Sequence, residues 1–482
     1  MTQRIGKTIR INISTDASTT ARPDPASLPL LARIGEWLKR HRSWILCLQW
    51  SVVLAYAVLV VLPVFLPLPA EDTHLWNNLT RFAQFMFWGL WWPGVMIATL
   101  TLGRTWCGVF CPEGTLTEWA SRHGMGRAIP RWLKWSGWPF AAFLGTTVYG
   151  QLISVYEYPQ AALLVLGGST LAAIALGLVY GKNKRVWCRH LCPANGVFGL
   201  LAKIAPLHYK VDRARWDDWD HRERSLETES IDCAPLIDIR RMKSASECHS
   251  CGRCHGHRDA VQWSWRAASA ELLDPSIAPK TTEVLTLLFG VLGVATAAFQ
   301  WSSSPWYVHI KLALAEWLID HGKEWLLQDN APWWLLTHVP TANDVFTWLD
   351  GALILGYLIG GGCALGALLA LIVAGSARLS ALSSDALGFR RLALALTPLG
   401  AANIILGLSM LTVSHLKAEQ IKLDWLTYPR SALFLWGALF SLTLAWRLLS
   451  TANTIRRISA LAIFCLAPIL LGTLWYTVFW VW

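Results

Sequence analysis

Residues 44–68 read WILCLQWSVVLAYAVLVVLPVFLPL and contain no charged side chain. A helix needs about 20 apolar residues to cross the ~30 Å hydrocarbon core of a bilayer, so this stretch is long enough to span a membrane. Further apolar runs lie at 82–102, 136–155, 161–180, 282–301, 349–375, 392–415, 431–446 and 458–480. We therefore predict a mostly α-helical, polytopic membrane bundle of about nine spans.

The composition agrees with a membrane protein and disfavours a soluble enzyme. Of the 482 residues, 54% are hydrophobic, only 15% are charged and thirty are tryptophan. Many of the tryptophans lie near predicted span ends, where amphipathic rings favour the headgroup layer. The net charge of +11 raises the possibility of nucleic-acid binding. We interpret the basic loops instead as topology determinants and as a rim for anionic lipid or an acidic redox partner, and we predict no nucleic-acid partner.

The distribution of basic residues predicts the orientation of the chain. When the nine spans are threaded through a membrane, 36 of the 42 Lys and Arg residues fall on the side of the N-terminus. Basic loops remain in the cytoplasm. We therefore expect a multi-pass chain with a cytoplasmic N-terminus and with Trp482 on the opposite side. The first span is not expected to be a cleavable signal peptide, because 43 residues precede it.

The spans and loops divide the sequence into six predicted segments. These are a basic cytoplasmic tail at 1–43, a four-span unit at 44–210, a polar cytoplasmic segment at 211–281, a fifth span at 282–301, an external segment at 302–348 and a C-terminal four-span bundle at 349–482. The composition of the tail up to about residue 30 is typical of a disordered segment. Apolar residues at helical spacing in the external segment, among them Ile310 and Trp317, predict that it lies along the membrane surface.

The cysteines are concentrated on one side of the predicted membrane. Eight of the eleven fall in predicted cytoplasmic loops, and none falls in an external loop. Structural disulfides belong to oxidising compartments, so this distribution favours thiolates kept reduced for metal binding or redox chemistry. Cys47, Cys363 and Cys465 stand alone within predicted spans, where we expect them to pack as small apolar side chains.

Cys248, Cys251 and Cys254 form a C-x2-C-x2-C run in the polar segment. This spacing is typical of bacterial ferredoxins, in which such a run holds three corners of a cubane cluster. The usual fourth cysteine is replaced by Arg258, but the upstream sequence Cys233-Ala234-Pro235 resembles the end of another ferredoxin run. We predict a small ferredoxin-like α+β insertion at 211–281 that holds one [4Fe-4S] cluster. Its predicted ligands are Cys233, Cys248, Cys251 and Cys254. A zinc site on the same cysteines is the alternative, and no role is assigned to His249, His255 or His257.

A second pattern occurs twice, 81 residues apart. Trp106-Cys107-Gly108-Val109-Phe110-Cys111-Pro112 and Trp187-Cys188-Arg189-His190-Leu191-Cys192-Pro193 share W-C-x3-C-P. Cysteines at i and i+4 lie on one face of a helix, and the residue before a proline tends to end that helix. Together the two motifs offer a second thiolate site of Cys107, Cys111, Cys188 and Cys192. An iron–sulfur cluster, a Cu(I) site and a reversible dithiol remain open, as does a purely structural role in ending the two helices.

Paired C-x3-C-P motifs after the second and fourth spans, followed by a ferredoxin-like segment, resemble the NosR/NapH-type membrane ferredoxins. CcoG, a cytochrome-oxidase assembly factor, is a more distant similarity. The resemblance covers about residues 44–300. It implies a component of an oxidoreductase system, and not a stand-alone enzyme, in a bacterial cytoplasmic membrane with a periplasmic C-terminus. Such a component passes electrons between a quinol pool or soluble donor and a respiratory redox partner. Family members usually carry two complete cubane motifs, whereas this chain has one complete set of four ligands.

The main alternative function is an assembly or maturation factor that handles or reduces a metal such as copper for a respiratory metalloenzyme. It ranks second, because none of the six methionines lies in a predicted external loop. A solute transporter would need more polar residues within its spans. Asn403 and His415 are candidates for a quinol pocket, although satisfied polar groups of a helix bundle are the preferred interpretation. Quinone binding is left open, and the C-terminal four spans have no assigned role.

Overall fold

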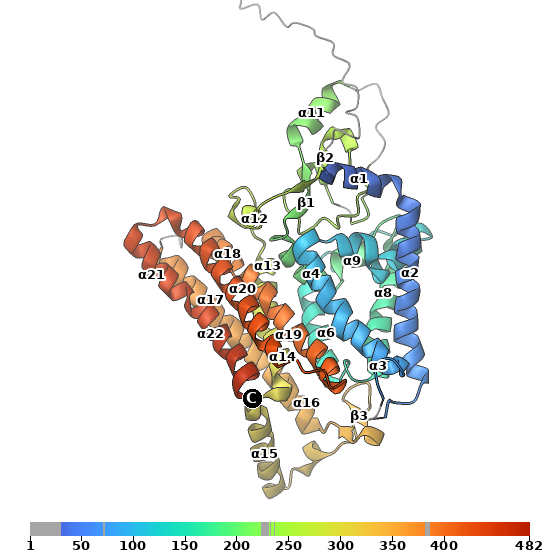
Figure 1. Cartoon of the computed structure of the whole chain (residues 1–482), viewed down its shortest axis with the longest axis vertical. Helices are drawn as coiled ribbons and strands as arrows, with labels where there is room; N and C mark the ends of the chain where they lie inside the picture. The colour runs from blue at the N-terminus through green and yellow to red at the C-terminus, as the bar shows by residue number, and fades with distance from the viewer. Residues whose placement is uncertain (1–29, 71–72, 223–230, 232, 236, 381–385) are drawn as a thin grey trace, which may run out of the picture.

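The computed structural model describes residues 30–70, 73–222, 231, 233–235, 237–380 and 386–482, and its elements are labelled in Figure 1. The predicted disorder of the tail up to about residue 30 lies outside the described residues. The described chain is mostly helical with two small sheets.

The first half of the chain forms a group of long helices with short helices at one end. α2 (Arg42–Val61) lies on the outside of this group (Figure 1). The other long helices are α3 (Leu79–Gln84), which continues through a π-helical turn into α4 (Trp92–Leu102), α6 (Trp138–Leu152), and α7 (Pro159–Ala162), which continues into α8 (Gly168–Tyr180). The short helices are α5 (Pro112–Arg122), α9 (Val186–His190) and α10 (Ala194–Ala202).

The second half forms a group of helices that packs against the first and shares a hydrophobic core with it (Figure 1). Its members are α13 (Thr281–Leu285), α14 (Ala295–Gln300), α16 (Trp348–Leu355), α17 (Gly362–Leu379), α18 (Ala386–Leu394), α19 (Thr397–Ala418), α20 (Thr427–Leu448), α21 (Thr454–Phe464) and α22 (Leu466–Tyr476). A Cβ atom added to Gly293, on the segment that joins α13 to α14, would lie 2.4 Å from the carbonyl oxygen of Gly362 at the start of α17. Small residues therefore allow these two spans to touch backbone to backbone, as membrane helices often do.

Eight continuous helical segments of the described chain are long and apolar enough to cross a membrane. They are Arg42–Phe65, Leu79–Leu102, Pro159–Tyr180, Thr281–Ser303, Trp348–Leu379, Thr397–Ala418, Asp424–Leu448 and Thr454–Val481. Each coincides with a predicted span, and the short run at 431–446 belongs to a helical segment of 25 residues. The predicted mostly α-helical, polytopic fold is confirmed.

The ninth predicted span, at 136–155, is shorter than expected. The corresponding helix, α6, has 15 residues, which at 1.5 Å per residue is about 22 Å, whereas the hydrocarbon core is ~30 Å thick. Ser154 adopts a left-handed φ of 49° just beyond its end. The backbone N–H of Val155 donates to the carbonyl of Gly150 at 2.9 Å. This turn ends the helix before the predicted boundary.

A small two-stranded sheet frames the polar segment. β1 (Leu207–Val211) pairs antiparallel with β2 (Val261–Trp265), with Leu207 opposite Trp265 and Val211 opposite Val261. The helices α11 (Arg213–Arg222) and α12 (Ala270–Leu273) flank it. Tyr209 and Val261 are buried in a small core under the sheet. The cysteines of the C-x2-C-x2-C run therefore lie on the connection between the two strands.

The helix α1 (Leu30–Arg40) packs on this connection, although the sequence predicted only a basic tail there. The Lys39 Nζ donates to the carbonyl of His255 at 3.1 Å. A Cβ on Gly35 would lie 2.4 Å from the ring of His255, and a Cβ on Gly252 would lie 3.2 Å from Cβ of Leu38. The helix therefore covers the loop that carries Cys251 and Cys254.

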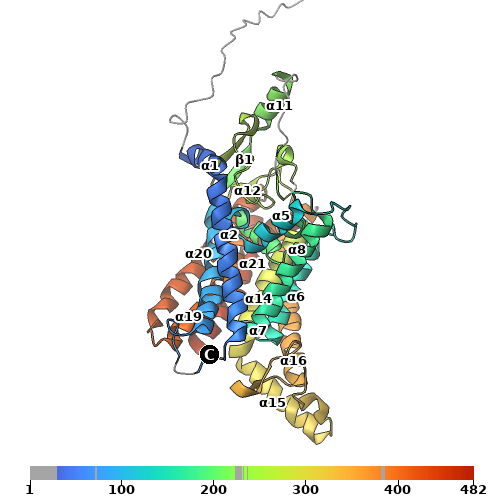
Figure 2. The same cartoon turned by 90° about the vertical axis from the view of Figure 1, so that its right-hand side faces the viewer.

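The external segment contains α15 (Pro305–Asp320) and a second sheet of β3 (His338–Val339) and β4 (Asp344–Val345). α15 projects from the lower end of the bundle in both views (Figures 1 and 2). Ile310 and Trp317 are 48% and 46% exposed, so the bundle does not cover these apolar side chains. That they lie on a membrane surface stays a prediction.

One predicted polar candidate is explained by packing. Asn403 of α19 is fully buried. Its Nδ2 donates to the carbonyl of Val291 at 2.9 Å, and its Oδ1 accepts from Trp475 Nε1 at 2.8 Å and from Thr296 Oγ1 at 3.2 Å. Hydrogen bonds that join three membrane-length segments therefore satisfy this amide. The preferred interpretation of Asn403 as a structural polar group is supported.

Candidate metal centres

The first C-x3-C-P motif ends a helical turn as its proline requires. Cys107 lies in a π-helical turn from Trp106 to Phe110, a geometry often found at functional sites. Cys111 is extended, with φ −66° and ψ 119°, because the ring of the following proline disfavours helical geometry. The backbone N–H of Cys111 donates to the carbonyl of Trp106 at 2.9 Å. Pro112 then begins α5.

The second motif closes in the same way. α9 contains Cys188 and ends at His190. The backbone N–H of Cys192 donates to the carbonyl of Trp187 at 3.0 Å, which is the counterpart of the bond in the first motif. The predicted helix ends are confirmed. The second cysteine of each pair, however, lies beyond the helix and not on its face.

The four cysteines of the two motifs lie around one cavity of about 260 Å³. Burial and, after it, the neighbouring thiols of Cys188 and Cys107 raise the pKa of Cys111 well above its ordinary value. Burial is also the main cause that raises the pKa of Cys188 to about 12. Burial therefore favours the neutral thiol, whereas a metal is bound by the thiolate, so a metal at this site would have to compensate the charge of the buried sulfur atoms. The structure thus brings Cys107, Cys111, Cys188 and Cys192 together.

The second set of cysteines lies on the loop between the strands. Ser250 and Gly252 adopt left-handed φ angles of 48° and 78°, so the chain curls tightly between the cysteines. The backbone N–H of Ser250 faces the sulfur of Cys248 at 3.3 Å. Burial is the main cause that raises the pKa of Cys248 to about 12, and the neighbouring thiols of Cys251 and Cys233 raise it further.

Cys233 is held near this loop by the helix of the second C-x3-C-P motif. The backbone N–H of Arg185 donates to the carbonyl of Ala234 at 2.8 Å. The guanidinium of Arg189 donates to the carbonyl of Pro235 at 3.2 Å. Arg258, which occupies the place of the missing cysteine, instead lies over the ring of Trp216 at 5.1 Å. The four predicted ligands Cys233, Cys248, Cys251 and Cys254 are therefore neighbours, and all four come from the connection between β1 and β2.

The donor chemistry of both cysteine sets suits an iron–sulfur cluster. Each set offers four cysteine thiols, and cysteine thiolates are the ligands that hold such clusters. Cysteine thiolates also bind zinc, so the zinc alternative for the set with Cys248 stays open. Within the ranges that the structure describes, no group of three or more Cys, His, Asp or Glu side chains is arranged to hold a single metal ion.

The two sets of cysteines are in direct backbone contact, which the sequence did not predict. A Cβ atom added to Gly108, next to Cys107, would lie 2.2 Å from the carbonyl oxygen of His249 and 2.8 Å from Cα of Cys251. Gln49 Nε2 donates to the carbonyl of Gly108 at 3.0 Å and fixes this turn. The absence of a side chain at position 108 lets the first motif lie against the ferredoxin-like loop.

Two buried arginines bridge the cysteine sets. Arg104 donates to the carbonyl of Ser246 and to Asn195 Oδ1, both at 2.6 Å, and one of its nitrogens lies 3.9 Å from the sulfur of Cys107. Arg185 donates to the carbonyl of Cys107 at 2.6 Å and pairs with Glu118 at 2.8 Å. These cations favour negative charge on nearby thiolates. The only sequence signal for them was their closeness to the cysteines.

Two histidines beside the loop, to which the sequence assigned no role, are buried. His249 and His255 have exposed fractions of 2% and 4%. His249 Nε2 lies 3.2 Å from the guanidinium of Arg104. Burial, followed by the charge of Arg104, lowers the pKa of His249 well below its usual value. Both side chains are buried because α1 and the first motif cover the loop.

Open cavities with basic rims lie beside the second set. Cys251 and Cys254 line a cavity of about 290 Å³ together with Lys39 and Arg42. Cys233 lines a neighbouring cavity of about 670 Å³ whose basic residues are Arg42, Arg122, Lys182, Lys184 and Arg253. Positive potential of this kind attracts acidic partners and anionic headgroups.

A family model of iron–sulfur proteins matches two segments of the chain. Residues 84–135 and 164–211 match the family model of a 4Fe-4S binding domain. Each matched segment contains one C-x3-C-P motif, and both lie outside the ferredoxin-like loop with Cys248. The family match therefore supports iron–sulfur cluster binding by this chain.

Three curated proteins are similar to part of the chain. The provisionally named electron transport protein YccM of Escherichia coli (strain K12) is 23% identical over 233 residues, which are 43% of this chain and 65% of YccM. The ferredoxin-type protein NapH of Haemophilus influenzae is 29% identical over 31% of this chain and 58% of NapH. The methylamine utilization ferredoxin-type protein MauN of Methylorubrum extorquens is 29% identical over 21% of this chain and 40% of MauN.

The chain thus spans between 40% and 65% of the length of these relatives. No solved structure shows a significant match to the chain. The predicted resemblance to NapH-type membrane ferredoxins is confirmed by the 4Fe-4S domain and by these relatives.

Proposed function

We propose that this relative of the NapH-type membrane ferredoxins is a bacterial inner-membrane electron carrier with two [4Fe-4S] sites. One site is formed by Cys233, Cys248, Cys251 and Cys254. The other is formed by Cys107, Cys111, Cys188 and Cys192. The backbone contact of Gly108 with His249 and Cys251 carries this proposal, because it joins the two sets into one continuous unit. When bound, such clusters supply one-electron transfer.

The protein contributes charge compensation and exclusion of water. Arg185 is 1% exposed and Arg104 is 3% exposed, and both lie between the two sets. In a buried site of low dielectric their positive charge acts on nearby thiolates more strongly than it would in water. We therefore expect the two arginines to stabilise the reduced, more negative state of both sites and to raise their reduction potentials.

The basic rim supports an acidic redox partner on one side of the membrane. We place this side in the cytoplasm, because the basic loops of membrane proteins remain there. Arg42, Lys182 and Lys184 line the cavity that contains Cys233. A soluble partner with an acidic surface would be steered to this site by long-range attraction. The proposed route runs between this partner and a quinol pool in the membrane, so that the chain acts as a component of an oxidoreductase system.

The decisive experiment counts iron. We expect the anaerobically purified chain to contain about eight irons with matching acid-labile sulfide, as two cubanes require. Cys107→Ala and Cys188→Ala should each lower the iron content to about four per chain, and so should Cys251→Ala. Variants in the C-x3-C-P set and variants in the set with Cys251 should remove different EPR signals of the dithionite-reduced protein. Cys363→Ala is the matched control, because Cys363 is exposed and lies in a membrane-length helix away from both sets.

The outcomes separate the competing functions. About four irons, unchanged by Cys107→Ala, would mean a single cluster on the ferredoxin-like loop and a different role for the C-x3-C-P motifs. Copper in place of iron, lost in Cys107→Ala, would favour the assembly or maturation factor. No iron in the anaerobic protein would refute an electron carrier.

A further inference from the structure

A further cavity, of about 230 Å³, lies at the start of α6 and of the helical segment Thr281–Ser303. Lys134 and Trp135, just before α6, line one side of it, and Lys280 and Thr282 line the other. The first N–H groups of a helix carry partial positive charge and favour anions nearby. Two helix starts at one cavity therefore favour a negatively charged ligand.

This cavity is separate from the candidate metal centres. Its wall contains none of the cysteines of the described chain. Arg104 and His249 line both this cavity and the one around the C-x3-C-P cysteines, so their side chains form the partition between the two. A cluster bound by the cysteines would therefore leave this cavity open.

The two carboxylates of the wall belong to ion pairs. Glu247 pairs with Lys280, and the carboxylate of Glu283 lies 3.2 Å from the buried Nζ of Lys203. Glu283 also accepts from the backbone N–H of Lys280 at 3.0 Å. The charge of each carboxylate is therefore already compensated by a lysine.

Two further cations of the wall have no carboxylate partner. Lys134 and Arg189 line the cavity, and in the part of the chain that the structure describes no carboxylate lies within ion-pair distance of either. Arg189 donates instead to the neutral carbonyl of Pro235 at 3.2 Å. The wall thus keeps an excess of positive charge, which a bound anion would compensate. Lysine and arginine are common ligands of phosphate groups.

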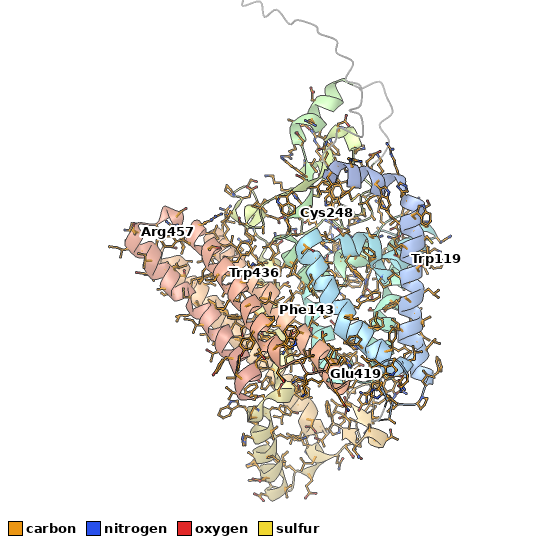
Figure 3. The ribbon with its side chains drawn as sticks, viewed as in Figure 1. Trp119, Phe143, Cys248, Glu419, Trp436 and Arg457 are labelled. Carbon is orange, nitrogen blue, oxygen red and sulfur yellow. The ribbon has the colours of Figure 1, made fainter. Side chains whose placement is uncertain are left out.

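The position of the cavity indicates a ligand that comes from the membrane. Trp135 is 56% exposed just before α6, and exposed tryptophans at helix ends favour the headgroup layer. Pro139 and Phe140, in the first turn of α6, supply an apolar side of the cavity. Figure 3 shows Phe143, in the next turn of α6, below Cys248. The apolar side therefore continues along α6 into the bundle, away from the ferredoxin-like loop.

We propose that this cavity binds the phosphate of an anionic phospholipid, with Lys134, Arg189 and Lys280 around the headgroup and the acyl chains along α6. A cavity of about 150 Å³ is sufficient for benzene, so about 230 Å³ holds a phosphate and a short polar extension, and the acyl chains stay in the bilayer. Basic pockets between membrane helices bind anionic headgroups in this way. The bound lipid would join α6 to the segment Thr281–Ser303, a role that electron transfer by itself does not require.

The test counts lipid molecules on the purified full-length protein by native mass spectrometry. Dioleoyl phosphatidylglycerol is the anionic probe, and dioleoyl phosphatidylcholine is the zwitterionic comparison. We expect one phosphatidylglycerol per chain to be retained in preference to phosphatidylcholine. Lys134→Gln should lower the affinity for phosphatidylglycerol about fivefold, about 1 kcal/mol, because one basic side chain near an anionic headgroup contributes about this much.

Lys210→Gln is the matched control. Lys210 is exposed on β1 and does not line the cavity, so this variant should bind phosphatidylglycerol as the unaltered protein does. Lys280→Gln is the second test variant and replaces Lys134→Gln if that variant does not fold. It leaves Glu247 unpaired in the wall and should weaken binding at least as much.

The outcomes separate the possible occupants. Equal affinity for the two lipids would overturn the site, as would equal affinity of Lys134→Gln and the unaltered protein for phosphatidylglycerol. Displacement of phosphatidylglycerol by an equal concentration of inorganic phosphate would show that free phosphate is the occupant, and the lipid assignment would be wrong. The iron content of the same samples should stay that of the unaltered protein. Loss of lipid only in iron-depleted samples would assign the effect to the metal centres and would also overturn the site.

Discussion

Replacing Gly108 by alanine tests the contact between the two cysteine sets. The new Cβ would lie 2.2 Å from the carbonyl oxygen of His249 and 2.8 Å from Cα of Cys251. Ordinary contacts between such atoms are about 3.5 Å, so the ferredoxin-like loop must retreat by roughly 1 Å. Both obstructing atoms are backbone atoms, and no side-chain rotation relieves the clash. Overpacking of this kind costs about 1–3 kcal/mol of stability.

The displacement matters more for the cofactor than for the fold. Metal sites need their ligand distances within about 0.2 Å, and a shift of roughly 1 Å at Cys251 exceeds this tolerance several times over. We therefore expect Gly108→Ala to lose the iron held by the set that contains Cys251, while the protein still inserts into the membrane. Iron content, acid-labile sulfide and EPR of the reduced protein measure this loss, and thermal unfolding measures the cost in stability.

Gly145→Ala is the matched control. Gly145 lies within α6, and a Cβ there would meet no atom within 4 Å. Alanine is favoured over glycine in a helix by about 1 kcal/mol, so this variant should be as stable as the unaltered protein or slightly more stable and should keep its iron. If Gly108→Ala kept full iron, an unchanged EPR spectrum and unchanged stability, the contact between the two sets would be refuted.

Two further predictions concern named side chains near the sites. Burial alone would raise the pKa of Glu118, but its pairing with Arg185 prevails and lowers the pKa to about 2. The pairing therefore stabilises the folded protein at a pH above about 4.3, the pKa of glutamate in the unfolded chain. This stabilisation is lost as the pH falls toward 2. Thermal unfolding should therefore show a steeper loss of stability on acidification in the unaltered protein than in Glu118→Gln, and parallel curves would contradict this. Arg258→Ala should keep all iron because Arg258 packs on Trp216, whereas Cys248→Ala should lose about four irons; equal losses would show that position 258 serves the cluster.

The membrane spans were predictable because they depend on local composition. Each of the eight long helical segments coincides with an apolar run in the sequence. In hydrocarbon the backbone polar groups of a spanning segment must be hydrogen-bonded within the segment, which favours a continuous apolar helix. α6 is the exception, because the left-handed Ser154 ends it early and hydropathy alone does not register a backbone turn. The ferredoxin-like sheet was predictable as a small α+β insertion but not in its register.

The candidate ligands were also predictable, whereas their surroundings were not. The spacing of Cys248, Cys251 and Cys254 and the repeat of C-x3-C-P are visible in the sequence alone. The contact at Gly108 and the burial of His249 depend on segments more than 100 residues apart, and no local pattern encodes such pairings. The sequence also leaves open the kind of metal site at the C-x3-C-P motifs, because four soft thiolates suit several metals.

The position of α1 has a consequence for the order in which the protein matures. The Lys39 side chain bonds to the backbone of His255, 216 residues later in the chain, so α1 has no docking surface until that loop has been synthesised. During synthesis the loop with Cys251 and Cys254 therefore emerges uncovered, and α1 can close over it only afterwards. We therefore expect iron and sulfide to reach this loop before α1 covers it, although α1 is translated long before the loop.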